Sequence, residues 1–430
     1  PIHVTILVSD GVFSDAGVFT IEIIPVNDAP IITSVPSYNI EVNELFEYII
    51  EIDDPDNDDF LFTIENEPDG MVLNENGIIT WIPESVGIYG PIALSVYDGG
   101  EDNSVAGTQA FSIEVVYNYL VANYNLYEGN NLISFYSIPP ESNSVEFVFE
   151  SLGSSITNIY GEGVFAQQHP VVGWIGSLTQ VSPEDGYWVR MEEDLPYNVY
   201  GLPTGVVEYT LHEGANLLSY SYDSSQDIQL ALPDDIKQKI FAIFGQNISA
   251  LNINGMWFGS LSSFEPGKGY WYITTEPFIF EYNPPSSSAL ARSNYNEFPP
   301  EEFNYYQSRF QSFYYIEELN LIHHEIEDGD WIVAYNGDNV VGARMWNGNY
   351  TDIPVMGYDN SDEYTDTFCK AGDKPEFKLF KSTSGELVSL KSNGEALPAW
   401  QSNQVFIVSS LQDQAYPVEV KLHSAYPNPF

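Results

Sequence analysis

A run of acidic residues is the part of this sequence best suited to bind a metal ion. Residues 53–59 read Asp-Asp-Pro-Asp-Asn-Asp-Asp, and Ca²⁺ takes roughly six to eight hard oxygen ligands of the kind that carboxylates supply. The candidate ligands within this run are Asp54, Asp56 and Asp58. Asp and Asn also form turns through hydrogen bonds from side chain to backbone, so a purely structural turn is the alternative.

The spacing of these acids argues against an EF-hand. A loop that starts at Asp54 would place Asp59 where an EF-hand requires glycine, and strand-like sequence follows instead of a helix.

Four tryptophans could stack against sugar rings. Two of them directly follow a tyrosine, and neighbouring residues of a strand point to opposite faces of a sheet, so one ring of each Tyr-Trp pair is expected in the core. Core packing is the favoured interpretation and a glycan platform the alternative. The candidate glycan residues are Trp174, Trp188, Trp257 and Trp271.

No catalytic signature stands out, and we predict that the chain is not an enzyme. The pair His323-His324 lacks the His-Glu-x-x-His spacing that places two imidazoles on one helical face, and no phosphate loop or nucleophile elbow is present. Carboxylate pairs for glycoside hydrolysis are too numerous to single one out. The only cysteine, Cys369, cannot form an intramolecular disulfide and is expected to be a packing residue.

The charge balance excludes nucleic acid as a natural partner. The formal net charge is -49, from 62 Asp and Glu against 13 Lys and Arg, and such a chain repels phosphate backbones. Hydrophobic residues make up 43% of the sequence, which predicts folded domains with acidic surfaces rather than a disordered acidic tail. No stretch approaches the roughly 18 apolar residues that span a membrane.

Two repeats divide the chain. The segment from Val8 to Gly11 recurs from Val96 to Gly99, and the strand-like segment at 19–23 recurs at 111–115, in both cases about 90 positions later. This period is typical of a β-sandwich domain. Residues 1–30 are therefore predicted to contain the last strands of a truncated copy and a linker, and residues 31–117 a whole copy.

These first two segments resemble bacterial cadherin-like and dystroglycan-type immunoglobulin-like domains. The resemblance depends on the linker Pro25-Val26-Asn27-Asp28-Ala29-Pro30, the acidic turn, the Gly-x-Ile-x-Trp-x-Pro motif that starts at Gly77, and the closing Val-x-Asp-Gly motif. It implies that Asn27, Asp28 and Asp98 join the acidic turn in a calcium site that stiffens the junction between domains.

A second repeat has a period of about 85 residues. The segments 128–135, 174–178 and 183–188 recur in the same order at 213–220, 257–261 and 266–271, which indicates duplication. We predict two small β-rich modules, 118–203 and 204–283, each with a short helix; Ser144 is the expected cap of the first. They resemble Asn-Leu-Ile-Ser and Gly-Tyr-Trp modules of secreted bacterial proteins.

The remaining sequence is predicted to contain a linker, another β-sandwich and a secretion signal. Residues 284–295 are rich in Pro, Ser and Ala, as linkers are. Strand-like runs joined by an Asn-Gly-Asp-Asn turn at 336–339 predict a sandwich over 296–423. Residues 424–430 resemble the start of the sorting domain of the type IX secretion system.

Together these features predict a mainly β fold: an elongated array of tandem immunoglobulin-like or cadherin-like β-sandwiches and small β-rich repeats. The expected function is that of a secreted, cell-surface-attached structural or adhesion protein that is stiffened by calcium or forms filaments. Its expected partners are neighbouring domains, copies of itself or surface glycans. The chain begins at Pro1 without a signal segment, which suggests an internal piece of a longer precursor. The alternative is the noncatalytic, glycan-binding portion of a large secreted hydrolase.

Overall fold

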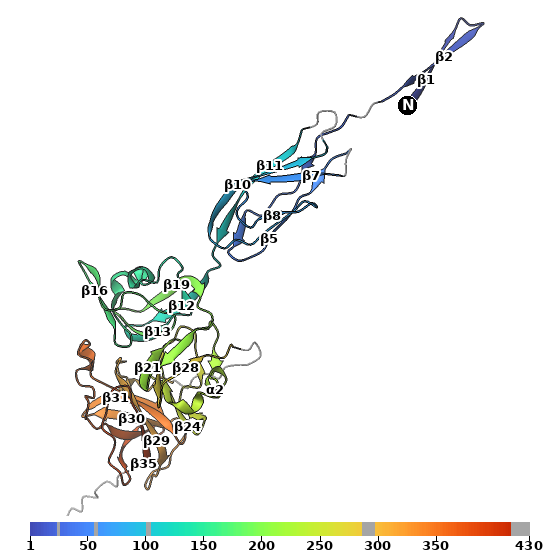
Figure 1. Cartoon of the computed structure of the whole chain (residues 1–430). Helices are drawn as coiled ribbons and strands as arrows, with labels where there is room; N and C mark the ends of the chain where they lie inside the picture. The colour runs from blue at the N-terminus through green and yellow to red at the C-terminus, as the bar shows by residue number, and fades with distance from the viewer. Residues whose placement is uncertain (24–25, 56–58, 100–104, 286–296, 414–430) are drawn as a thin grey trace, which may run out of the picture. The chain divides into compact units, whose positions relative to one another are not determined.

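The structure, a computed structural model, describes residues 1–23, 26–55, 59–99, 105–285 and 297–413. The chain divides into two compact units, Pro1–Asn118 and Tyr119–Phe430, which are described separately (Figure 1). The regular secondary structure of both units consists almost entirely of β-strands, which confirms the predicted mainly β fold class. None of the described helices is long and apolar enough to cross a membrane.

The first unit begins with a hairpin of two antiparallel strands, β1 (Ile2–Ser9) and β2 (Ser14–Ile21). Asp10 closes its turn, because one carboxylate oxygen accepts the backbone N–H groups of Val12 and Phe13 at 2.9 and 2.8 Å. The apolar side chains of the hairpin are exposed: Val8 is 67% exposed, whereas its repeat equivalent Val96 is 0% exposed. The hairpin thus has the strand pattern of the whole copy without its core.

A sandwich of two sheets follows. Its strands are β3 (Ile31–Ile32), β4 (Asn39–Glu41), β5 (Phe46–Ile49), β6 (Ile52–Asp53), β7 (Leu61–Glu65), β8 (Val72–Leu73), β9 (Ile78–Trp81), β10 (Gly87–Tyr97) and β11 (Gly107–Val116). One sheet has the order β4-β11-β10-β7 and the other β5-β9-β8. Inward residues alternate with outward ones along β11, and the core includes Trp81 from one sheet and Phe111 from the other.

The second unit starts with the two predicted repeats. The first repeat contains β12 (Leu120–Leu126), β13 (Gly129–Ser134), β14 (Ser137–Ile138), α1 (Val145–Val148), β15 (Ile156–Tyr160), β16 (Phe165–His169), β17 (Gly173–Gly176), β18 (Gly186–Met191) and β19 (Leu195–Pro203). Ser144 caps α1 as predicted, since its hydroxyl accepts the N–H of Phe147 at 3.2 Å. A 3₁₀ helix, Glu150–Ser155, follows and bends at Gly153.

The second repeat has a similar order of elements, with one additional short strand. It contains β20 (Glu208–Leu211), β21 (Gly214–Leu218), β22 (Gln226–Asp227), α2 (Ile228–Ala231), β23 (Ile240–Phe244), β24 (Ser249–Ile253), β25 (Met256–Phe258), β26 (Ser263–Phe264), β27 (Tyr270–Thr274) and β28 (Phe278–Glu281). Its five-stranded sheet, β21-β27-β23-β24-β25, matches the sheet β13-β18-β15-β16-β17 of the first repeat strand for strand. The shared topology is what duplication of one module produces.

The C-terminal module differs from the expected sandwich of two sheets. Its strands are β29 (Gln311–Leu319), β30 (Trp331–Asn336), β31 (Asn339–Met345), β32 (Thr351–Met356), β33 (Glu376–Lys381), β34 (Glu386–Ser392) and β35 (Val405–Asp413). They form one seven-stranded sheet of order β31-β30-β33-β34-β35-β29-β32. The end strands approach closely, because a Cβ atom on Gly342 of β31 would lie 1.7 Å from the carbonyl oxygen of Pro354 of β32. The sheet therefore curls until its two ends meet.

Candidate functional site

The candidate metal ligands of the first unit come from segments that meet at one end of the sandwich. The Asn27 side-chain amide donates a hydrogen bond of 2.7 Å to the Asp98 carboxylate. Strand β3 pairs with β6 so that Ile31 lies opposite Asp53, which brings the linker beside the start of the acidic turn at Asp54. The structure therefore places the linker residue Asn27 in contact with the closing turn at Asp98.

This arrangement fits a calcium site in its choice of donor atoms. Asp98 is only 8% exposed, and a carboxylate and an amide side by side are both oxygen ligands that Ca²⁺ accepts. The Asn27 amide nitrogen faces Asp98 here, so rotation of the amide would be needed to present its oxygen. Asp56 and Asp58 lie outside the described residues. Within the described ranges no group of three His, Cys, Asp or Glu side chains is placed to hold a metal ion.

The second unit buries the aromatic residues that were candidates for glycan binding. Trp188 is 2% and Trp271 is 9% exposed, and the preceding tyrosines, Tyr187 and Tyr270, are 0% and 1% exposed. Both rings of each pair are therefore in the interior, although the two rings lie on opposite faces of their strand. Trp174 and Trp257 are half-buried and pack against the cores of their own repeats. A flat exposed platform at Trp188 and Trp271 is incompatible with this burial.

Trp188 and Trp271 belong to a separate apolar cluster that joins three modules, which we call the seam. Phe244 of the second repeat stacks on Trp271 with ring centroids 6.4 Å apart, and it contacts Phe313 of the C-terminal module at 5.5 Å. Burial of this much apolar surface is the main force that holds such modules together. The buried members of the seam are Leu132, Trp188, Leu217, Ala242, Phe244, Leu251, Trp271, Phe313, Tyr315 and Val405.

The two repeats face each other across a pseudo-two-fold axis. The backbone N–H of Ser134 donates to the carbonyl of Gly267 at 3.0 Å, and at the equivalent positions Ser219 donates to Glu184 at 2.9 Å. A second reciprocal pair of bridges joins Ile133 to Lys268 and Leu218 to Asp185. Each contact from the first repeat to the second therefore has an equivalent contact from the second repeat to the first. This is the pattern of a self-complementary dimer interface.

Side chains from the opposite repeat also hold the seam strands. Gln246 accepts the backbone N–H of Leu132 at 3.0 Å, and Glu162 accepts that of Leu217 at 2.8 Å. These residues occupy equivalent places just after β23 and β15. The interface therefore combines apolar packing with satisfied backbone groups.

A buried polar cluster attaches the C-terminal module to the second repeat. Arg344 is 1% exposed and Asp352 is 2% exposed. The Arg344 guanidinium donates to the backbone carbonyl of Asn247 and, at 3.0 Å, to that of Asp352. The Asp352 carboxylate accepts the hydroxyls of Ser249 and Ser260 at 2.8 and 2.6 Å. Burial raises the pKa of the Asp352 carboxyl, and the charge of Arg344 opposes that shift.

An ion pair and a cation–π contact attach the C-terminal module to the first repeat as well. The Arg190 guanidinium lies 2.8 Å from the Asp362 carboxylate, which is also 3.2 Å from the side-chain nitrogen of Asn130. Arg309 pairs with Asp359 at 2.5 Å and covers the ring of Tyr160 at 4.0 Å. Both repeats are therefore attached to one C-terminal sheet by buried or half-buried charges.

His323 and His324 both contact Asp413, the last residue of β35 in the C-terminal sheet. Burial alone would raise the pKa of Asp413, but the backbone N–H groups of Ile322 and His323 and the ring of His324 hold it at about 2.

Cys369 is a packing residue: it is 0% exposed, and burial raises the pKa of its thiol to about 12. A thiol with this pKa is protonated at neutral pH and a poor nucleophile.

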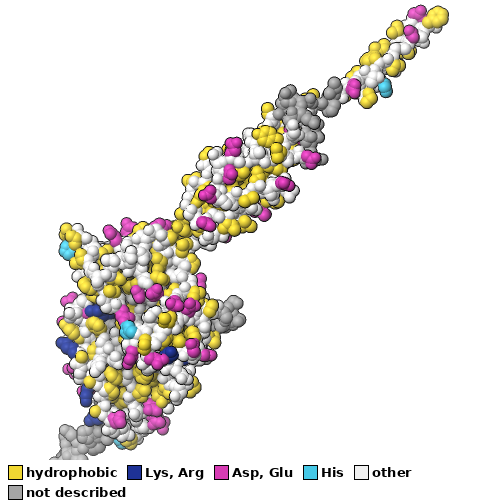
Figure 2. Space-filling view, in the orientation of Figure 1, with side chains coloured by type: hydrophobic (Ala, Val, Ile, Leu, Met, Phe, Trp, Pro, Cys, Tyr) yellow, Lys and Arg dark blue, Asp and Glu magenta, His cyan; other side chains and the backbone are white. Residues whose placement is uncertain are grey.

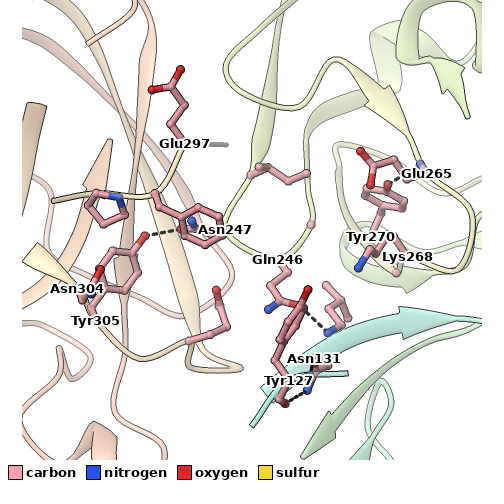
Figure 3. Close-up of a pocket in the computed structure, with 17 residues that line it drawn as sticks. Tyr127, Asn131, Gln246, Asn247, Glu265, Lys268, Tyr270, Glu297, Asn304 and Tyr305 are labelled. Carbon is pink, nitrogen blue, oxygen red and sulfur yellow. Dashed lines mark hydrogen bonds between the residues drawn. The ribbon is translucent and has the colours of Figure 1, made fainter. Parts of the chain in front are cut away.

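A cavity of about 420 Å³ lies where the two repeats and the C-terminal module meet (Figure 3). The first repeat contributes Tyr127 and Asn131, the second contributes Gln246 and Lys268, and the C-terminal module contributes Tyr305. The sequence did not predict it, because its walls come from three modules that were expected to be separate.

Comparisons with known proteins do not assign this chain to a family. No protein-family model matches it, and neither does any curated protein. Two crystal structures of the N-terminal four Ig domains of Dscam1, isoforms 1.9 and 8.4, align with 89% and 88% of this chain and with 100% and 99% of their own length. The sequence identity is 8% in both, and the TM-scores are 0.17 and 0.18. A similarity of this size supports no argument about family or function.

The docking of the three modules left a signal in the sequence that only an aligned comparison of the repeats reveals. Strand β24 of the second repeat carries Leu251 and Ile253 on the face that enters the seam, and the first repeat has Gln167 and His169 there. Ala242 of β23 likewise corresponds to Asn158. An apolar face in one copy and a polar face in the other indicate that only the second repeat is covered there.

Proposed function

We propose that this chain is a structural, adhesion-type part of a secreted or cell-surface protein, and that residues 119–413 act as one rigid body within it. The observation that supports this proposal is the seam. It makes a single interior out of modules that each have a core of their own. A body of this kind holds binding surfaces at fixed spacing and resists extension, which suits a stalk or spacer.

The proposed location outside the cell is supported by the sequence. The linker and turn motifs of residues 25–99 resemble those of extracellular cadherin-like domains, and residues 424–430, which lie outside the described residues, resemble a type IX sorting signal. Acidic side chains are spread over the visible face and basic ones are few (Figure 2). We propose neighbouring domains, further copies of the chain or surface glycans as partners.

The hydrolase-associated alternative loses its main support in the structure. It depended on Trp188 and Trp271 as an exposed sugar platform, and both are buried. The proposal therefore assigns neither a catalytic role nor a tryptophan platform to this chain.

Mechanical extension tests the proposed rigid body. When the full chain is pulled from its two ends in a force spectrometer, residues 119–413 are expected to lengthen in one step of about 100 nm, at roughly 3.5 Å per residue. The physical reason is that rupture of the seam exposes all three modules at once. Three separate steps, two of them near 30 nm, would mean that the modules bear load independently and would contradict the proposal.

We also propose that Ca²⁺ binds between Asn27, Asp28, Asp54, Asp56, Asp58 and Asp98. Calcium in tenfold excess over its dissociation constant is expected to raise the melting temperature of the first unit by about 5 °C, because a ligand that binds only the folded state stabilises it. Asp98→Asn should abolish this increment. Asp69→Asn removes the same charge from an exposed position away from the linker and should keep it. An equal calcium response in both variants would exclude this site.

A further inference from the structure

The cavity between the three modules has the size and lining of a site for a small polar ligand. Its volume of about 420 Å³ falls within the range of about 300–1,000 Å³ that small-molecule sites occupy. Among the described residues, the lining mixes aromatic rings with amide groups and includes the cation Lys268. Figure 3 shows Lys268, Gln246 and Tyr127 on neighbouring parts of the wall, with Asn304 and Tyr305 across the open space.

Lys268 differs from the cations of this acidic chain that are held in short ion pairs. Arg190, Lys237, Arg309 and Lys381 each lie within 2.8 Å of a carboxylate oxygen. Among the described residues, by contrast, no carboxylate lies within ion-pair distance of the Lys268 ammonium group. The Lys268 side chain is exposed; the atoms packed beside it lower its pKa, and the charge of the nearby Glu265 opposes that shift. Its three N–H donors are therefore available to a ligand.

The pseudo-two-fold axis provides an internal comparison. The residues equivalent to Tyr127 and Gln246 in the other half are His212 and Glu162. His212 Nε2 and Glu162 Oε1 form a hydrogen bond of 2.7 Å, which is an ion pair when His212 is protonated. Tyrosine and glutamine cannot form a His–Glu pair of this kind, so the cavity half lacks it. Asp185 takes the place of Lys268. Duplication has therefore produced two halves with one backbone arrangement and different polar chemistry.

We propose that this cavity binds an uncharged saccharide. Sugar hydroxyls both donate and accept hydrogen bonds, and the cavity offers Lys268 as a donor and the side-chain amide of Asn304 as donor and acceptor. The C–H faces of a sugar pack on aromatic rings, and Tyr127 and Phe298 at the cavity are 58% and 93% exposed. An anionic sugar is disfavoured, because Glu265 and Glu297 line the cavity and the whole chain carries a net charge of -49. This site stands apart from the structural role, which needs no ligand.

Saturation-transfer NMR on the full chain tests this site. The probes are glucose, galactose, mannose and N-acetylglucosamine, with glucuronate as the anionic comparison. We expect at least one neutral sugar to bind saturably with a dissociation constant in the millimolar range, which is typical of a weak single-ring ligand. Lys268→Gln and Tyr127→Ala should each weaken that binding at least tenfold.

Lys391→Gln is the matched control, since it removes the same charge from an exposed residue of β34. It should bind as the unaltered chain does, and all variants should keep the same melting temperature. Binding by none of the four neutral sugars, or equal binding by Lys268→Gln and Lys391→Gln, would overturn the proposal. Tighter binding of glucuronate than of any neutral sugar would overturn the uncharged ligand class.

Discussion

Replacing Arg344 by alanine is expected to lower the free energy of unfolding of residues 119–413 by about 3–5 kcal/mol, the cost of breaking a buried ion pair by removing one partner. Arg344 and Asp352 are almost fully buried, and the hydrogen bonds of this pair cross from the C-terminal sheet to the second repeat. Without the guanidinium, the Asp352 carboxylate remains in the interior without a compensating charge. Urea denaturation followed by tryptophan fluorescence measures the loss.

The loss should depend on pH in a defined direction. Burial already raises the pKa of Asp352 above its ordinary value, and removal of Arg344 raises it further. A carboxyl whose pKa is higher in the folded state favours folding when protonated, and this contribution is lost as pH rises through the folded-state pKa. The Arg344→Ala deficit should therefore be larger at pH 7 than at pH 4.

A second substitution provides the control for this interpretation. Asp352→Asn introduced together with Arg344→Ala removes the uncompensated charge and should restore part of the stability, since the two residues are coupled. A loss below about 1 kcal/mol in Arg344→Ala, or no rescue by Asp352→Asn, would show that this cluster does not hold the modules together.

Replacing either seam tryptophan by alanine is expected to cost about 3–5 kcal/mol of stability, as is usual for a buried Trp in a well-packed core. Trp188 and Trp271 occupy equivalent places in the two repeats, so their losses should be similar. Trp188→Phe and Trp271→Phe should cost less, because phenylalanine keeps most of the apolar contact. It also removes an indole N–H that is buried in each case without a hydrogen-bond partner among the described residues.

Tyr200→Ala is the control for the tryptophan variants, because Tyr200 is an aromatic residue of β19 that is 58% exposed. It should change the unfolding free energy by less than about 0.5 kcal/mol, as exposed positions usually do. Unchanged stability in Trp188→Ala and Trp271→Ala, combined with lost retention on insoluble polysaccharide, would restore the glycan-platform interpretation.

Local features of this fold could be predicted from the sequence because they depend on short-range chemistry. The cap at Ser144 follows from a hydroxyl placed before an apolar run, and the β30–β31 hairpin follows from its Asn-Gly turn. The two repeats were visible because equal spacing of similar segments needs no knowledge of contacts. The linker was located by its Asn-Asp-x-Pro motif, through the resemblance to cadherin-like domains.

The packing of the modules against one another could not be predicted, because it depends on contacts between residues far apart in the chain. Arg344 meets Asn247, and Asn130 meets Asp362, and nothing in their local sequence indicates these partners. The C-terminal module was predicted as two sheets because alternating strands alone do not tell a sandwich from a curled single sheet. Its closure depends on Gly342, where only a residue without a side chain lets β31 approach β32.

Scanning calorimetry of the full chain tests most directly whether residues 119–413 form one body. The account predicts one transition for these residues, with equal calorimetric and van't Hoff enthalpies, separate from that of the first unit. Arg344→Ala should shift this whole transition to lower temperature. Separate transitions for the two repeats and the C-terminal module, of which Arg344→Ala shifts only the last, would contradict the account.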